Sequence, residues 1–236
     1  MKRSGFLPVM VVAVSLAAGA AYADSEKGAA KPAAVALYEQ GKTKYGEGQR
    51  DDARALMESA CDGGYAEGCY LLGKAYTNRW FGSVGEEAPQ EAFLRGCDQG
   101  HALACKEAGY AYAIQGVVDP SFRPKAFELR KRACELNELV ACQFVGVEYL
   151  KSTESWHKQD YAQAAIYLGK ACDDDKSTAC AELGRMHYYG WGMPANRDEA
   201  VRLVQKAYTL SRDNTLVTDI IAELNRAEEK KQAQSQ

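Results

Sequence analysis

The 236-residue chain has few of the residues that metal binding most often uses. It contains only three histidines, and no two of its eight cysteines have the two-residue spacing typical of zinc sites. The formal net charge is −3, and no basic stripe runs along the sequence, which argues against a nucleic-acid partner. The sequence therefore predicts no bound metal, no cofactor and no contact with nucleic acid.

A long apolar run that could span a membrane is also lacking. The apolar stretch from Phe6 to about Ala20 follows Lys2 and Arg3 and is short for a span. The small residues of "AYA" (21–23) then predict a signal peptide over 1–23, with an uncleaved anchor as the alternative. No cysteine lies near this boundary, so we do not expect a lipoprotein. We expect a periplasmic or secreted protein without stable membrane insertion after cleavage.

All eight cysteines fall in four pairs, and each pair encloses seven residues. The first cysteines of successive pairs are 36, 37 and 38 positions apart, a period typical of stacked repeats. Export places these cysteines in an oxidising compartment, where an even number implies disulfides. The four segments are "CDGGYAEGC" (61–69), "CDQGHALAC" (97–105), "CELNELVAC" (134–142) and "CDDDKSTAC" (172–180).

Other positions keep the same register. Each first cysteine is followed three residues later by a type that tolerates left-handed backbone, as a helix end requires: Gly64, Gly100, Asn137 and Asp175. Four residues after each second cysteine stands a glycine: Gly73, Gly109, Gly146 and Gly184. A small residue precedes each first cysteine: Ala60, Gly96, Ala133 and Ala171. Each unit is therefore predicted to be helix A, a tight turn, helix B with its glycine close to helix A, and a longer loop.

The cysteine spacing requires the turn. On one continuous helix, residues eight apart lie about 12 Å apart along the axis, whereas a disulfide needs Cα atoms within roughly 7 Å. Each pair can close only where the chain reverses. The predicted bridges are Cys61–Cys69, Cys97–Cys105, Cys134–Cys142 and Cys172–Cys180.

The register extends beyond the cysteines at both ends. Residues 197–210 match helix A of a fifth, cysteine-free unit, with Tyr208 and Leu216 in the cysteine positions. Residues 36–48 resemble an isolated helix B and predict an N-terminal cap helix. We expect a disordered linker over 24–34, a solenoid over 35–226 and a disordered tail over 227–236.

These features together resemble the Sel-one-like repeat family of tetratricopeptide-like αα-hairpins. The "LG" pairs at 72–73 and 183–184, the small residue before each first cysteine, and "YYGWGMPANRDEA" (188–200) carry the resemblance. The paired cysteines narrow it to the subfamily of Helicobacter cysteine-rich proteins. The resemblance implies an all-α superhelix that acts as an exported adaptor for a protein or peptide partner. It also implies an alternative, because some members of the subfamily bind or slowly hydrolyse β-lactams.

One motif bears on that alternative. "SWHK" places Ser155 three residues before Lys158, which is the Ser-x-x-Lys spacing of penicillin-binding serine enzymes. No Ser-Asp-Asn or Lys-Thr-Gly partner accompanies it, and so short a motif also occurs by chance. Oxidised cysteines supply no thiolate. The sequence favours binding over catalysis and leaves Ser155 and Lys158 as the candidate catalytic pair.

The candidate binding residues follow from the repeat register. Two residues before the first-cysteine position stand four cations, which would form a basic row on one face of the solenoid: Arg95, Arg132, Lys170 and Lys206. The alternative is a solvated face in which Glu91 and Glu128 pair with arginines one turn later on their own helices. Trp80 and Phe81 lie in a loop and could anchor a partner.

Overall fold

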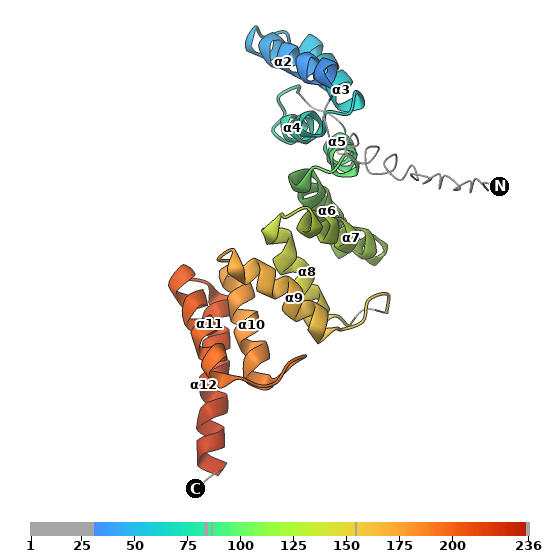
Figure 1. Cartoon of the computed structure of the whole chain (residues 1–236). Coiled ribbons are helices and arrows are strands. Elements are labelled where there is room, and N and C mark those ends of the chain that lie inside the picture. The colour runs from blue at the N-terminus through green and yellow to red at the C-terminus, as the bar shows by residue number, and fades with distance from the viewer. Residues whose placement is uncertain (1–30, 83–84, 86, 154, 235–236) are drawn as a thin grey trace, which may run out of the picture.

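The computed structural model describes residues 31–82, 85, 87–153 and 155–234, and these form helices and loops without a strand. Successive helices stack along an elongated, curved rod with its first and last helices at opposite ends (Figure 1). The predicted signal peptide lies outside the described residues. The elements are α2 (Pro32–Gly46), α3 (Arg50–Asp62), α4 (Ala66–Thr77), α5 (Glu87–Asp98), α6 (Ala102–Val118), the 3₁₀ helix η1 (Pro120–Phe122), α7 (Arg123–Glu135), α8 (Leu139–Lys151), α9 (Tyr161–Asp173), α10 (Ser177–Tyr189), α11 (Arg197–Leu210) and α12 (Thr215–Gln234).

Four tight turns, each within a cysteine pair, separate α3 from α4, α5 from α6, α7 from α8 and α9 from α10. The residue predicted to be left-handed has a positive φ in every turn: 91° at Gly64, 88° at Gly100, 69° at Asn137 and 60° at Asp175. The next residue donates its N–H to the carbonyl of the small residue before the first cysteine, as Tyr65 does to Ala60 at 3.1 Å. This is the Schellman motif, which satisfies carbonyls at a helix end.

A disulfide closes each of these turns. The bridges are Cys61–Cys69, Cys97–Cys105, Cys134–Cys142 and Cys172–Cys180, with Cα atoms 4.4 to 4.7 Å apart. All eight cysteines are buried. Each bridge therefore staples the end of one helix to the start of the next, as the spacing predicted.

The most extensive packing, however, is between helices joined by the longer loops. Helices joined by a longer loop pack against each other more extensively than helices joined by a disulfide turn. The extensively packed pairs are α2–α3, α4–α5, α6–α7, α8–α9 and α10–α11. The prediction that a helix B glycine lies close to a helix A is correct, but its partner is the following helix. A Cβ at Gly146 would lie 2.9 Å from the backbone nitrogen of Leu168, and one at Gly184 would lie 3.1 Å from the carbonyl oxygen of Ala200.

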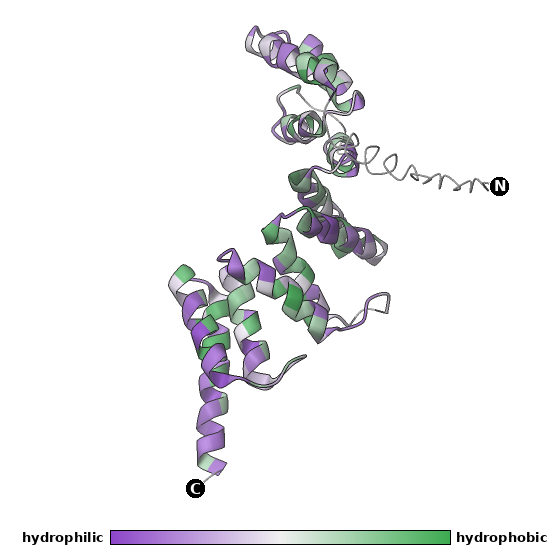
Figure 2. Cartoon of the chain, viewed as in Figure 1, coloured by the Kyte–Doolittle hydropathy of each residue, from purple (hydrophilic) through white to green (hydrophobic). Residues whose placement is uncertain are grey.

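The glycine contacts repeat along the rod. Gly41, Gly73, Gly109, Gly146 and Gly184 each face the residue four positions before the first-cysteine position of the next helix. Those partners are Met57, Phe93, Arg130, Leu168 and Val204. The small residue before the first cysteine is buried at the disulfide junction, where a Cβ at Gly96 would lie 2.8 Å from the Cβ of Ala104 and 3.2 Å from that of Cys69. Apolar residues accordingly concentrate where neighbouring helices meet (Figure 2).

Both ends of the solenoid extend beyond the predicted limits. Helix α2 starts at Pro32, inside the predicted linker, and α12 continues through Gln234, so residues 227–234 are helical rather than disordered. Val217, Ile220 and Leu224 anchor the first half of α12, and Arg197 forms an ion pair with Glu228 at 2.9 Å. The remaining "EEKKQAQ" residues favour helix once the helix is nucleated. None of the described helices is long and apolar enough to cross a membrane.

We predict that Gly146→Ala lowers the free energy of unfolding by about 1–3 kcal/mol, because the added methyl group overpacks the contact with Leu168. Gly169→Ala, in neighbouring α9, is the matched control, since nothing lies within 4 Å of its added Cβ. We expect this control to stabilise the protein by about 0.5–1 kcal/mol through helix propensity. Urea denaturation followed by circular dichroism measures both; equal effects at the two glycines would refute the close-packing account.

We also predict that replacing both Cys134 and Cys142 by alanine lowers the free energy of unfolding by about 2–3 kcal/mol, because the short closed loop then gains freedom in the unfolded chain. The same denaturation experiment, run on the oxidised protein and its variant, gives the difference. A change below about 0.5 kcal/mol would mean that the Schellman turn alone holds the reversal.

Candidate binding surfaces

The predicted basic row is largely paired with acids of the preceding unit. Arg95 forms an ion pair with Asp62, and Arg132 with Asp98 at 3.2 Å. Neither arginine pairs with Glu91 or Glu128 of its own helix, so the alternative prediction of pairs within one helix is also incorrect. The remaining cation of the cysteine-containing units, Lys170, has its ammonium 5.8 Å from the ring centroid of Tyr167.

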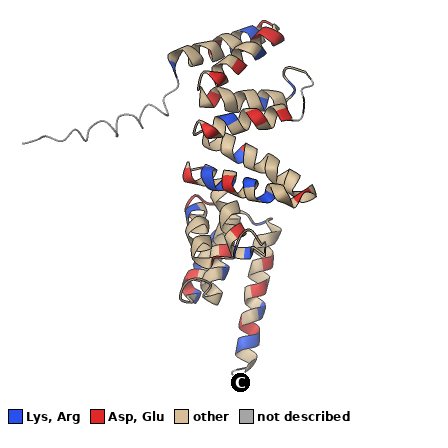
Figure 3. Ribbon diagram, turned by 90° about the vertical axis from the view of Figure 1, so that its right-hand side faces the viewer, with Lys and Arg blue, Asp and Glu red and all other residues tan. Residues whose placement is uncertain are grey.

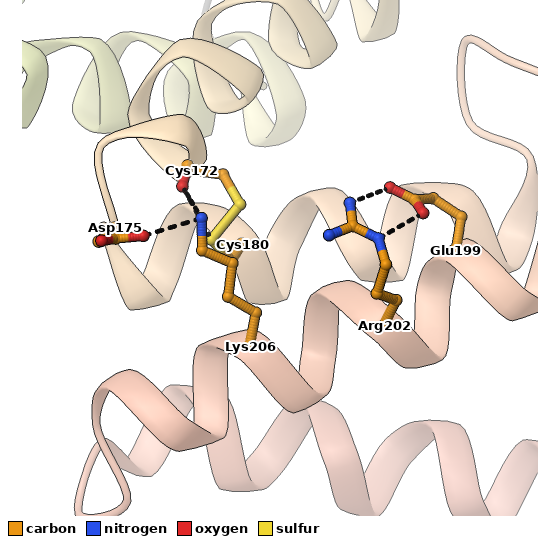
Figure 4. Close-up of a disulfide and its surroundings, with 6 residues drawn as sticks. All are labelled: Cys172, Asp175, Cys180, Glu199, Arg202 and Lys206. Atoms are coloured by element: carbon orange, nitrogen blue, oxygen red, sulfur yellow. Dashed lines mark hydrogen bonds and ion pairs between the residues drawn. A yellow bond between two sulfur atoms is a disulfide. The ribbon is translucent and has the colours of Figure 1, made fainter.

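The last member of the row shows the arrangement most completely. Lys206 of α11 reaches back to the preceding disulfide turn, where it contacts the carboxylate of Asp175 at 2.8 Å and donates to the carbonyl of Cys172 at 2.7 Å. Figure 4 shows this lysine beside the Cys172–Cys180 bridge, with Arg202 paired separately to Glu199. Acidic and basic residues are interspersed along the helices of the rod (Figure 3). These cations therefore connect successive units.

The predicted aromatic anchors pack within the N-terminal part of the solenoid. Trp80 stacks on Tyr45 at a centroid distance of 5.1 Å and remains 40% exposed. Phe81 makes edge contacts with Tyr45 and Tyr76 and joins the buried cluster there. The two side chains thus fasten the loop after α4 to the end of α2, and only Trp80 offers substantial surface.

Ser155 and Lys158 lie in the exposed turn between α8 and α9. A Ser-x-x-Lys nucleophile requires the two side chains to be adjacent at the start of a helix. Helix α9 begins only at Tyr161, capped by Asp160, whose carboxylate accepts from the N–H of Gln163 at 3.0 Å. The arrangement lacks the helical geometry that would let the lysine activate the serine.

We therefore predict that the purified protein does not hydrolyse nitrocefin above the rate of a Ser155→Ala variant, measured by absorbance of the opened product. Turnover that this substitution abolishes would restore the enzyme alternative.

Each of the three histidines makes contacts within the fold. His101 caps α6: its Nδ1 accepts from the N–H of Ala104 at 3.2 Å, and its Nε2 lies 2.5 Å from a carboxylate oxygen of Glu67. His157 is buried between Phe127 and Tyr149. His187 lies on α10, where its carbonyl accepts from Asn196. Within the described ranges, no three histidine, cysteine or acidic side chains gather as metal ligands would.

A buried ionic network holds α12 against the end of the solenoid. Glu182 is fully buried on α10, with Lys151 and Arg185 both at 2.6 Å. Arg185 also pairs with Glu223 of α12 at 3.4 Å. Burial, together with a hydrogen bond to Glu223, raises the pKa of Tyr189 to about 12. Because each partner would leave buried charge behind if removed, this network is structural.

An open groove lies between α11 and α12, and the sequence reasoning did not identify it. It has a volume of about 700 Å³, and apolar side chains including Val201, Val204, Ile221 and Leu224 line it. Val201 and Tyr208 are 55% and 44% exposed. The rim carries uncharged polar groups: Gln205, Thr209, Thr218 and Asn225.

A smaller opening within the solenoid has comparable walls. Between α3 and α4 these are Glu58 and Asp62 on one side and Leu72 and Tyr76 on the other, and Ala88, Glu91, Ala92 and Arg95 of α5 line the same space. That space has a volume of about 280 Å³. Counting from the α12 cap Asn214, Ile221 and Asn225 match Leu72 and Tyr76, and Thr218 rather than the predicted Leu216 holds the second-cysteine position. The terminal groove therefore corresponds to a space that the following helix lines within the solenoid. The exposed apolar residues of the cysteine-free unit were the available signal.

Comparison with known proteins agrees with this division into hairpins. The Sel1 repeat family matches residues 33–65, 139–176 and 177–211, which correspond to α2–α3, α8–α9 and α10–α11. The Xenopus tropicalis protein named cytochrome c oxidase assembly factor 7 is 28% identical over 170 residues, which are 69% of this chain and 72% of that relative.

Two solved structures have the same fold. One is c5321, a protective antigen of uropathogenic Escherichia coli strains with an SLR fold, at a TM-score of 0.61 and 24% identity. This chain aligns over 87% of its own length and spans 43% of that structure. The other is a Sel1 repeat protein from Oxalobacter formigenes, at a TM-score of 0.56 and 18% identity over 80% of this chain and 73% of that one.

The matched repeats, the packing of the helices and the fold agree with one another. Matched repeats coincide with the most extensively packed helix pairs, and the whole fold is an αα-hairpin solenoid. Four bridges at the predicted spacing fit the cysteine-rich subfamily. This chain contains Sel1 repeats over these three ranges and has the fold of solved Sel1-like repeat proteins.

Proposed function

We propose that the protein is a protein-binding scaffold in an oxidising compartment, and that the α11–α12 groove receives an amphipathic helix of a partner. The observation that carries this proposal is the correspondence of the open groove to the space between α3 and α4 that α5 lines inside the solenoid. A helix in such a groove is a common mode of peptide recognition.

The compartment follows from the cysteines. All eight are bridged and buried, which suits an exported protein better than a reduced cytosol. The signal peptide predicted over 1–23 supports the same location. The assembly factor that this chain resembles carries a name that implies work on other proteins, in keeping with a binding role.

The chain's own helices indicate what the partner helix should look like. Three of the five helices A have a small residue, an apolar residue four positions later and another small residue three positions after that: Ala53–Met57–Ala60, Ala164–Leu168–Ala171 and Ala200–Val204–Ala207. The apolar member faces the preceding helix, and the small members allow close approach. We expect the partner helix to carry the same spacing and to lack charge on that face, since the groove is lined mainly by apolar groups.

The test is fluorescence anisotropy with a labelled helical peptide that carries Ala-x-x-x-Leu-x-x-Ala, against a scrambled peptide of equal composition. We expect Ile221→Asp to weaken binding at least tenfold, because it places a charge among the apolar walls. Ile166→Asp is the matched control. Ile166 is 52% exposed on α9, does not line the groove, and should leave affinity unchanged.

Equal binding of the scrambled peptide, or equal losses in the two aspartate variants, would refute the groove as the binding site. A dimer mass for the protein alone by sedimentation, reduced to the monomer mass in Ile221→Asp, would show instead that a second copy occupies the groove.

A further inference from the structure

One unit departs from the packing rule that the others follow. The residue that faces the helix B glycine is apolar in four units: Met57, Phe93, Leu168 and Val204. In the remaining unit it is Arg130, whose Cγ would lie 3.0 Å from a Cβ at Gly109. An arginine at an otherwise apolar interior position has a cost in desolvation, which calls for a specific explanation.

The Arg130 side chain packs against an aromatic ring and forms no ion pair with a described residue. Its guanidinium lies 4.8 Å from the ring centroid of Phe144 on α8. Among the described residues it makes no hydrogen bond or ion pair, and Glu148 of α8 lies beyond ion-pair distance. Burial lowers the pKa of Arg130, while the charge of Glu148 acts in the opposite direction. The side chain remains a cation with unused donors.

These donors border a cavity of about 160 Å³ between α6, α7, α8 and the α8–α9 loop. Arg123, Arg130, Phe144, Glu148 and Trp156 are among its lining residues. The indole N–H of Trp156 is buried without a hydrogen-bond partner. Arg123 at the entrance donates from its Nε to the carbonyl of Gly116 at 3.0 Å. The cavity therefore combines a cation with aromatic side chains.

We propose that this cavity binds a carboxylate group, which the Arg130 guanidinium recognises beside the side chain of Trp156. This inference rests on the proposed binding function and names a second recognition element for the partner, an acidic side chain. A planar guanidinium pairs with a carboxylate through two parallel hydrogen bonds, so the unused donors and the ligand match in shape. The ring of Phe144 and the arginine plane provide flat surfaces for the methylene groups.

The volume of the cavity and the charges that line it limit which ligands can bind. A volume of about 160 Å³ suits a small group, such as a carboxylate on a short aliphatic chain. Glu148 contributes one negative charge to the same cavity and disfavours a dianion such as phosphate. A single carboxylate on a short aliphatic chain, as in glutamate, fits both limits.

The experiment follows the tryptophan indole signals in ¹H–¹⁵N spectra of the full chain, which has three tryptophans. N-acetyl-glutamate amide is the probe, N-acetyl-glutamine amide its neutral isostere and propionate the free carboxylate. Trp156→Phe assigns the Trp156 signal. We expect the glutamate compound to shift that signal alone and the glutamine compound to leave it unchanged. Binding of propionate as well would show that a free small acid suffices, whereas its failure would show that the peptide group is needed.

Arg130→Met is the decisive variant, because methionine occupies the same position at Met57 and preserves the packing against glycine. We expect it to weaken binding of the glutamate compound at least tenfold while leaving the thermal unfolding curve cooperative. Arg132→Met is the matched control: this arginine lies on the same helix, pairs with Asp98, does not line the cavity, and should leave the shift intact.

An unchanged titration in Arg130→Met, an equal response to the glutamine compound, or no shift at millimolar concentration would overturn the carboxylate site. The carboxylate site and the α11–α12 groove can be tested independently of each other. Arg130→Met should bind the helical peptide normally, and Ile221→Asp should still respond to the glutamate compound.

Discussion

Four units of this solenoid depend on a reversal of chain direction completed between two cysteines eight positions apart. A left-handed residue ends the first helix, a Schellman hydrogen bond satisfies its carbonyls, and the disulfide prevents the two ends from separating. Since the same turn recurs four times, the angle between successive helices is set locally each time. The curved rod is the accumulated result of these local settings.

The second level of organisation is contact between helices across the longer loops. Glycine on one helix and alanine or glycine on the next remove side-chain bulk where the backbones approach. In a repeat protein each unit contacts mainly its neighbours, and among the described residues α11 and α12 border an open groove. Cations such as Arg132 and Lys206, which reach back to the preceding turn, add further links between successive units.

Local features were predictable from sequence, and those that require the placement of neighbours were not. Asn137 and Asp175 were identified as left-handed because their position relative to the cysteines matched Gly64 and Gly100. The glycine on helix B indicated close approach, but spacing alone does not distinguish the preceding helix from the following one. For the same reason Arg95 was expected to pair, if at all, with Glu91 and not with Asp62, 33 residues away. The groove at α11–α12 and the cavity at Arg130 become visible only when the units are superimposed in space.

The location of the disulfides has a mechanical consequence. They lie at the joints between the most extensively packed hairpins, not within those hairpins. Reduction would therefore leave each hairpin's glycine contacts in place while releasing the covalent restraint on how one hairpin is oriented to the next. The redox state of the surroundings would govern the pitch and stiffness of the rod, and with them the spacing between surfaces located in different units.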